Sequence, residues 1–388
     1  MKRLKYFLIL ILLIGLSTTV YGEELEIIDS VLEEQMDNHI QMEEIDKFLK
    51  DLMEENEIQL GSAREIILKL LKGEKPIDGQ AIRESIGNIF LREVRFSLSL
   101  ITKILIIVLI STILTNLQNS FEESSISQLA NYFTCILIAI LVIANFSQIM
   151  DLARATVGRM TDFMQVLLPI LLTLLVITGG PNTKIVFHPM ILGTVNVLGL
   201  LVNNIIFPLL YFSFIISILS NLSQRAELGK LAELGRQIIT FIITAAFTIF
   251  IGILTIYGLS TKIDGLTIRT AKFAIDTLVP IVGGFLSDAV DTVIGSSAIL
   301  KNGIGIIGLL SLIMMILMPI IKVVVLLLLY SIIGAVIEPI ASSNIIKFFG
   351  ESSKTLLLIL VSMVSIGIMF FITITIIVDT GNNLMMLR

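Results

Sequence analysis

Long apolar runs separated by short polar segments dominate the chain after residue 97. A helix needs roughly 20 mainly apolar residues to cross the hydrocarbon core of a bilayer. The pattern therefore predicts an all-α, polytopic membrane domain over 98–388. The runs lie at about 98–117, 129–150, 163–178, 186–202, 205–220, 238–257, 304–321, 323–337 and 355–378.

Two places leave the number of crossings between seven and nine. The span 186–220 is too long for one crossing and holds Asn203, Asn204 and Pro208 near its middle, so we divide it there. The runs on either side of Lys322 fit two crossings, or one crossing and a re-entrant segment.

Amphipathic segments precede the membrane domain. Apolar residues recur at helical spacing around 28–40, 45–53 and 82–94. Between the last two, Ser62 and Glu65 predict a capping box, and Gly73 predicts the end of that short helix. No helix breaker separates 82–94 from the first long run, so we expect the helix to continue into it. The interpretation is a small helical region over 23–97.

The first 22 residues have the order of a secretory signal. Basic Lys2, Arg3 and Lys5 precede an apolar run to about Leu16 and then small and polar residues up to Gly22. The run is short for a crossing, so we expect cleavage near Gly22, with an uncleaved anchor as the alternative. Region 23–97 would then be extracytoplasmic.

Composition and charge agree with this division. Apolar residues make up 55% of the 388 residues and charged ones only 15%, far fewer than in a soluble domain. Region 23–97 holds 19 acidic and 9 basic residues, which argues against nucleic acid as a partner. Cys135 is the only cysteine, so no intramolecular disulfide can form.

Basic residues give conflicting signals about topology. The polar segment with Arg225, Lys230 and Arg236 is expected in the cytoplasm, and an exported N-terminus with nine crossings places it there. The same arrangement puts Arg154 and Arg159 outside, which the positive-inside rule disfavours.

Motifs for chemistry are scarce. The two histidines, His39 and His188, are far apart and have no metal-ligand spacing, and the chain has no P-loop. The segment "GIGIIG", 303–308, matches a dinucleotide motif but begins an apolar run, so a small-residue face for close helix packing is the better interpretation. We expect no enzyme activity, cofactor or metal.

The segment at about 262–303 is unusual. Two amphipathic half-helices flank the joint "PIVGG", which contains Pro280, Gly283 and Gly284. Asp288 and Asp291 share a small, polar face of the second half-helix. Either this hairpin lies in the headgroup region, or it enters the bundle, where the aspartates line a watery path or pair with Lys301.

The chain resembles the stage III sporulation protein AE family of endospore-forming bacteria. The resemblance rests on "VPIVGGFLSDAVDTVIGSSAILKNGIGIIGLL", on the signal followed by an acidic helical region with "LLKGE", and on the polytopic remainder. It implies a place in the mother-cell membrane around the forespore, within a channel or feeding apparatus needed for forespore sigma factor G activity. It also implies the other products of the stage III operon as partners, including a secretion-type ATPase, and a membrane insertase of the Oxa1 type.

The leading hypothesis is thus a non-enzymatic subunit of that channel, with Pro280, Gly283, Gly284, Asp288, Asp291 and Lys301 as candidate pore-lining or packing residues. Self-association of the chain stays open. The alternative is a stand-alone secondary transporter for a small solute or ion, coupled through Asp288 and Asp291. A membrane enzyme has no acid, base or nucleophile set to support it.

Overall fold

The long apolar runs form helices that continue through the polar segments between them. The computed structural model describes residues 42–56, 61–71, 79–119, 124–178, 181–222, 228–278, 283–339, 341 and 343–386. All regular elements in this part of the chain are helices, which confirms the all-α prediction. They are α3 (Met42–Asn56), α4 (Ala63–Leu71), α5 (Gly79–Asn119), α6 (Ser124–Ile177), α7 (Pro181–Leu201), the π-helix η1 (Val202–Ile206), α8 (Phe207–Leu222), α9 (Gly229–Leu278), α10 (Gly283–Ile337) and α11 (Ser343–Met386).

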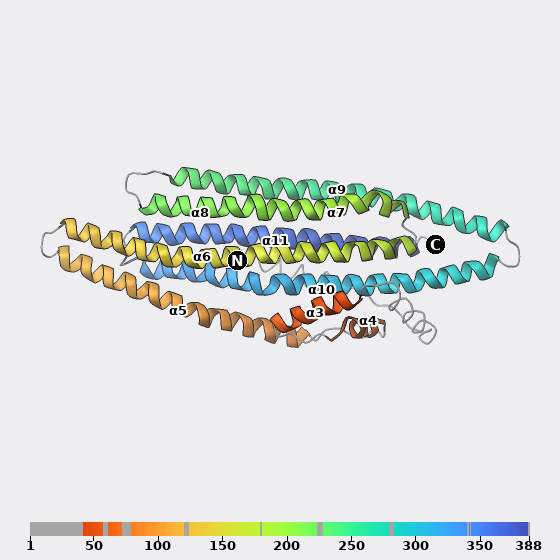
Figure 1. The fold of residues 1–388 in the computed structure, drawn as a ribbon, viewed down its shortest axis with the longest axis horizontal. Coiled ribbons are helices and arrows are strands. Elements are labelled where there is room, and N and C mark those ends of the chain that lie inside the picture. The colour runs from red at the N-terminus through yellow and green to blue at the C-terminus, as the bar shows by residue number, and fades with distance from the viewer. Residues whose placement is uncertain are drawn as a thin grey trace.

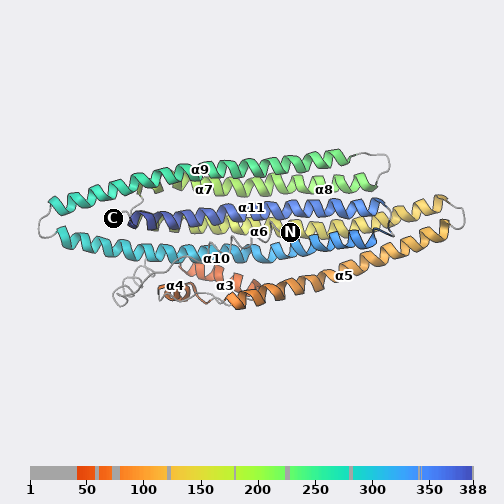
Figure 2. The ribbon, with the colours of Figure 1, turned by 180° about the vertical axis from the view of Figure 1, so that it is seen from behind.

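The long helices lie side by side along one axis (Figures 1 and 2). Helix α6 has 54 residues, which gives a length of about 80 Å at 1.5 Å per residue. A bilayer has a hydrocarbon core of about 30 Å. The bundle is therefore much longer than the membrane is thick.

Five helical stretches among the described residues are long and apolar enough to cross a membrane. The chain is accordingly a multi-pass membrane protein. The full number of crossings stays a prediction, because the side chains of 114–131, within or beside the first two runs, lie outside the described set. The five stretches are Tyr132–Ile177, His188–Asn221, Gly229–Ile256, Ile294–Ile337 and Asn344–Thr380.

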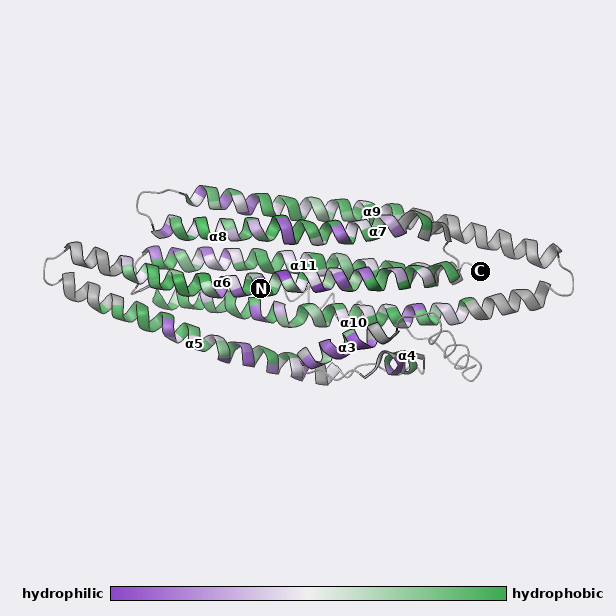
Figure 3. Ribbon diagram, in the orientation of Figure 1, coloured by the Kyte–Doolittle hydropathy of each residue, from purple (hydrophilic) through white to green (hydrophobic). Residues whose placement is uncertain are grey.

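The predicted loop between the runs at 129–150 and 163–178 is wrong. Helix α6 is continuous across it, so Arg154 and Arg159 lie on a helix in the middle of the bundle. Figure 3 shows this central stretch of α6 as hydrophilic, with an apolar stretch on each side of it. The positive-inside rule counts basic residues in loops, so it does not apply to these two helix residues.

The breaks predicted at Pro208 and at Lys322 are also absent. Pro208 is the second residue of α8, directly after η1, where the N–H of Phe207 donates to the carbonyl of Val202. A π-turn shifts the hydrogen-bond ladder, so a residue without an N–H is accommodated there. Helix α10 passes through Lys322 without a break, which removes both the division into two crossings and the re-entrant alternative at this position.

The N-terminal helices pack onto the bundle. Helix α5 confirms that 82–94 continues into the first long run, and its Ile89 packs with Ile321 and Val325 of α10. Leu49 of α3 and Ile66 of α4 are fully buried in the same core as the long helices. The boundary predicted at residue 97 therefore marks no break in packing, and the signal predicted at 1–22 lies outside the described residues.

Local hydrogen bonds connect α3 to α4. The hydroxyl of Ser62 accepts from the N–H of Glu65 at 3.2 Å, as the predicted capping box requires. The carboxylate of Asp46 on α3 accepts from the N–H of Ala63 at 2.7 Å. Two free N–H groups at the start of α4 are thus satisfied. The predicted stop at Gly73 lies outside the described residues.

Candidate functional site

The hairpin predicted at 262–303 corresponds to the junction of α9 and α10. Helix α9 ends at Leu278 and α10 begins at Gly283, so the chain reverses where "PIVGG" was predicted to act as a joint. The predicted half-helices are the ends of two long helices, and this pair extends beyond the ends of α6 and α11 (Figures 1 and 2).

Most of the predicted site residues lie outside the part of the chain whose side chains the structure describes. Pro280 lies outside the described residues, and Gly283 and Gly284 are the first residues of α10. Asp288 and Asp291 lie within α10, but their side chains are outside the described set. Whether the hairpin is interfacial or inserted therefore stays a prediction.

Lys301 is the predicted site residue whose surroundings are described. Its side chain is fully buried, and its Nζ forms no hydrogen bond to the described part of the chain. Its α10 neighbour Ser297 is also fully buried, with a hydroxyl that makes no hydrogen bond there. The field of Asp379, on α11, acts on this lysine. The segment thus holds a buried cation in a partly unsatisfied polar layer.

Pairing of Lys301 with either aspartate of its own helix is incompatible with the backbone. Asp291 and Asp288 precede it by ten and thirteen residues of continuous helix. At 1.5 Å per residue these separations are about 15 and 20 Å along the axis. A carboxylate partner has to come from another helix, and among the described side chains the charge of Asp379 acts on Lys301.

Three neighbouring helices enclose α10 next to Lys301 through the glycines of "GIGIIG". A Cβ placed on Gly303 would lie 2.8 Å from Ile67 of α4, and one on Gly308 would lie 2.5 Å from Leu167 of α6. A Cβ on Gly305 would overlap Val378 of α11. These contacts confirm that the glycines allow close helix packing. They do not form a single face, because at 100° per residue Gly303 lies on the side of α10 opposite to Gly305 and Gly308.

A second polar cluster, which sequence reasoning missed, lies at the opposite end of the bundle. Arg236 of α9 pairs with Glu351 of α11 at 2.7 Å, and Ser217 of α8 donates to the same carboxylate at 3.3 Å. Lys354 donates to its other oxygen at 2.7 Å. The sequence signal for this cluster was Glu351, a single acidic residue shortly before the apolar run 355–378.

The two polar layers are separated by about the thickness of a membrane. Glu351 and Asp379 lie on the same helix, 28 residues apart, which corresponds to about 42 Å. A bilayer with its headgroup regions is about 40–45 Å thick. Helix α11 therefore carries one polar layer at each expected membrane surface.

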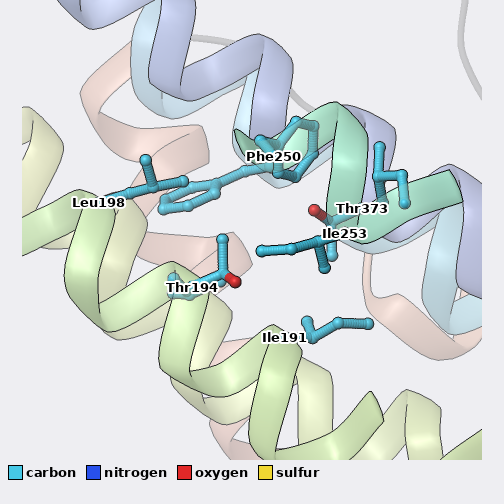
Figure 4. A pocket seen from close by; sticks show the side chains of 9 residues that line it. Ile191, Thr194, Leu198, Phe250, Ile253 and Thr373 are labelled. Atoms are coloured by element: carbon cyan, nitrogen blue, oxygen red, sulfur yellow. The ribbon is translucent and has the colours of Figure 1, made fainter. Parts of the chain in front are cut away.

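A small crevice between α7, α9 and α11 is apolar (Figure 4). Leu198, Phe250 and Ile253 line it, and two threonine hydroxyls point near it. Those hydroxyls already donate within their own helices, Thr194 to the carbonyl of Met190 and Thr373 to that of Met369. The crevice therefore presents apolar walls around a space of about one water molecule.

Residue types that bind metals are not gathered in the described part of the chain. No group of three or more His, Cys, Asp or Glu side chains there lies close enough to hold an ion. His188 is half-buried on α7.

Comparison with known proteins gives a family match over most of the chain. The sequence model described as Stage III sporulation protein AE matches residues 62–381. The Stage III sporulation protein AE of Bacillus subtilis (strain 168) is 32% identical over 355 residues, which cover 90% of this chain and 88% of that protein. No solved structure matches the chain. Because the match runs from α4 to near the end of α11, the chain belongs to the stage III sporulation protein AE family.

Proposed function

We propose that this chain is a non-enzymatic integral membrane subunit of the channel complex between mother cell and forespore. It acts in the mother-cell membrane and is required for the activity of forespore sigma factor G. Its partners are the other stage III operon products, including a secretion-type ATPase, and an insertase of the Oxa1 type assists its insertion.

The observation that carries the proposal is the extent of the family match. It includes α4 and the long helices, rather than a few apolar segments that any membrane protein might share. Among the described residues, the polar cluster around Glu351 connects three helices, α8, α9 and α11.

The transporter alternative loses its main structural argument. Transporters of that kind place substrate between broken helices near the middle of the membrane. Here the segments predicted as half-helices are continuous parts of α9 and α10. The π-helix η1 lies between α7 and α8, but the chain stays helical without a gap on both sides of it.

The arrangement of the bundle supports a topology in which region 23–97 lies outside the cytoplasm. The N-terminal helices pack beside Gly303, near the end where the α9–α10 hairpin extends. Lys230 and Arg236, predicted in the cytoplasm, lie near the opposite end of α9. With 23–97 outside the cytoplasm, the α9–α10 hairpin would point toward the forespore membrane.

The test is purification of the tagged full-length chain from sporulating cells. We expect the secretion-type ATPase and other products of the operon to be retained, and a tagged unrelated multi-pass protein at equal level to retain none of them. Recovery of the chain alone after mild cross-linking, with normal sigma G reporter activity in a deletion strain, would contradict the proposal.

A narrower test concerns Asp288 and Asp291, which we propose to line a polar path or contact within the complex. Replacing both by asparagine nearly preserves volume and removes two charges. Sporulation frequency and sigma G reporter activity should both fall while membrane levels stay normal. Wild-type values in both assays would instead indicate that the segment is an amphipathic hairpin at the membrane surface.

A further inference from the structure

The outward face of α9 is polar at its start and apolar further along. Lys230 and Glu233 are exposed in its first two turns. The exposed residues that follow include Phe241, Ile249 and Ile256, at 73%, 65% and 49% exposure. This side of the bundle therefore suits lipid after the second turn of α9.

The outward face of α6 has the opposite order, although both helices run parallel to α11 (Figures 1 and 2). Phe133 and Ile140, in its first half, are 67% and 58% exposed. Asp151, Arg154 and Asp162 come after them and are exposed. The later apolar residues of α6 are mostly buried by other helices. The part of α6 that suits lipid is thus its first half.

Contacts place Ala155 of α6 near the centre of the apolar run of α11 that ends at Val378. Gly305 of α10 packs at Val378, and Gly308, about one turn further, packs at Leu167 of α6. Because α10 runs opposite to α11, Leu167 is level with α11 about one turn before Val378. Ala155 comes twelve positions before Leu167, so it is level with the middle of that run.

Thr244 of α9 lies at the same height. Phe250 of α9 lines the small crevice together with Phe370 and Thr373 of α11 (Figure 4). Thr244 comes six positions before Phe250, so it is also level with the middle of the α11 run. Ala155 and Thr244 are therefore matched positions on α6 and α9.

Ile140 and Lys230 form a second matched pair, nearer the start of α11. Ile140 comes fifteen positions before Ala155, and Lys230 comes fourteen before Thr244. At this height α6 exposes an apolar residue and α9 exposes a charge. Around Ala155 and Thr244 the reverse holds, with charges on α6 and apolar residues on α9.

The two lipid-suited runs are therefore displaced along the bundle. The centre of 129–150 on α6 and the centre of 238–257 on α9 differ in height by about 20 residues, or about 30 Å. This displacement is as large as the hydrocarbon core of a bilayer is thick, about 30 Å.

Helix α5 has the same displacement as α6. Its Ile89 packs with Ile321 of α10, which is level with the middle of the α11 run. From there α5 continues toward the end of the bundle that holds Glu351 (Figure 1). Ile106 and Ile113, 17 and 24 positions further, are 51% and 58% exposed. The apolar surfaces of α5 and α6 thus lie at one height.

An upright bundle is incompatible with one flat bilayer. With the apolar part of α9 in the hydrocarbon core, the exposed isoleucines of α5 and α6 would lie in water. Asp151, Arg154 and Asp162 would lie in hydrocarbon, where charged side chains are costly. A bilayer plane oblique to the bundle axis satisfies both sides.

The size of the tilt follows from the width of the bundle. Helices α5, α10, α11 and α9 form a row in which each packs on the next, with α5 and α9 at opposite edges (Figures 1 and 2). At about 9 Å per helix, the row is about 35 Å wide. We propose that the bundle lies in the bilayer at a tilt of about 40°, so that the apolar surfaces of α5, α6 and α9 form one lipid-facing band.

The tilt brings polar residues to the membrane surfaces. Glu351 and Asp379, about 42 Å apart along α11, become about 32 Å apart along the membrane normal, close to the thickness of the core. Asp151, Arg154 and Asp162 reach the headgroup region and water on the side of Asp379.

Spin labels on the purified full-length chain, reconstituted into vesicles of phosphatidylcholine and phosphatidylglycerol, test the tilt. Cys135→Ser removes the native thiol. Single cysteines then replace the two matched pairs, as Ala155→Cys, Thr244→Cys, Ile140→Cys and Lys230→Cys. Oxygen concentrates in the hydrocarbon core, and a nickel chelate stays in water. We expect labels at 140 and 244 to collide mainly with oxygen, and labels at 155 and 230 mainly with the chelate.

An upright bundle gives the other pattern, with oxygen at 155 and 244 and the chelate at 140 and 230. Collision mainly with the chelate at 140, or mainly with oxygen at 155, would overturn the proposal. A label at either position that meets neither reagent would overturn it too, because protein would then cover that position.

A second measurement needs no substitution. Polarised infrared spectroscopy of the unmodified protein in oriented bilayers reports the mean tilt of its helices, which run along the bundle axis (Figure 1). We expect a mean tilt of about 40°, against an average of about 20° for membrane helices. A mean tilt below about 30° would contradict the oblique insertion.

Discussion

Arg236 of α9 and Glu351 of α11, which are 115 positions apart in the sequence, form an ion pair at 2.7 Å. Their side chains are 14% and 24% exposed, so water reaches the pair only partly. The same carboxylate accepts from Ser217, which brings α8, α9 and α11 together at one end of the bundle. This contact fixes the relative positions of α9 and α11 along the bundle axis.

Replacing Arg236 by glutamine should lower the free energy of unfolding by about 2 kcal/mol, less than for a fully buried pair because both groups are partly exposed. Lys354 is the matched control, since it contacts the other oxygen of Glu351 at 2.7 Å but is 64% exposed. Lys354→Gln should cost about 0.5 kcal/mol or less. Thermal unfolding of the purified variants in detergent measures both, and equal losses would show that burial does not decide the strength of these contacts.

Gly305 and Gly295 lie on the same helix but differ in the space around them. A Cβ on Gly305 would overlap the stiff, β-branched Val378, whereas a Cβ on Gly295 would meet nothing within 4 Å. Gly305→Ala should therefore destabilise the protein by about 1–3 kcal/mol. Gly295→Ala should be neutral, or stabilise it by up to about 1 kcal/mol through helix propensity. The comparison uses thermal unfolding at equal expression, and a Gly305→Ala variant as stable as the wild type would contradict the close α10–α11 contact.

Lys301 is expected to reduce stability and to support function. Methionine has a similar shape without the charge, so Lys301→Met should leave the thermal stability unchanged or raise it by about 1 kcal/mol or more. Sporulation frequency should nevertheless fall. Lys322→Met, at a half-buried lysine of the same helix, serves as the control and should sporulate normally. A less stable Lys301→Met protein would instead assign the lysine a purely structural role.

The two ends of the bundle should differ in access to the outside of the cell. Ser62 and Lys230 are both exposed, at the start of α4 and of α9 respectively. In the Cys135→Ser background, Ser62→Cys should react with a membrane-impermeant thiol reagent in intact protoplasts. Lys230→Cys should react only after lysis. The reverse labelling pattern would show the opposite topology. Reaction of both variants in intact protoplasts would show that the two ends lie on the same, outer side of the membrane.

Helix formation could be predicted from the sequence because it depends on neighbouring residues. The hydroxyl of Ser62 accepts the N–H of Glu65 as the capping box required, and α5 continues from 82–94 into the first long run. The glycines of "GIGIIG" were correctly assigned to helix packing, since only glycine allows such close approach. In each case the deciding interactions lie within a few residues along the chain, or depend on the size of one side chain.

The tertiary structure decided where helices end and what the polar residues contact. Hydropathy measures the transfer of single residues, and it does not report whether backbone hydrogen bonds continue through a polar segment. The segment 151–162 therefore looked like a loop, although α6 continues through it with α10 and α11 packed alongside. The partner of Glu351 and the burial of Lys301 depend on helices more than 50 residues away, because contacts between helices are set by three-dimensional packing.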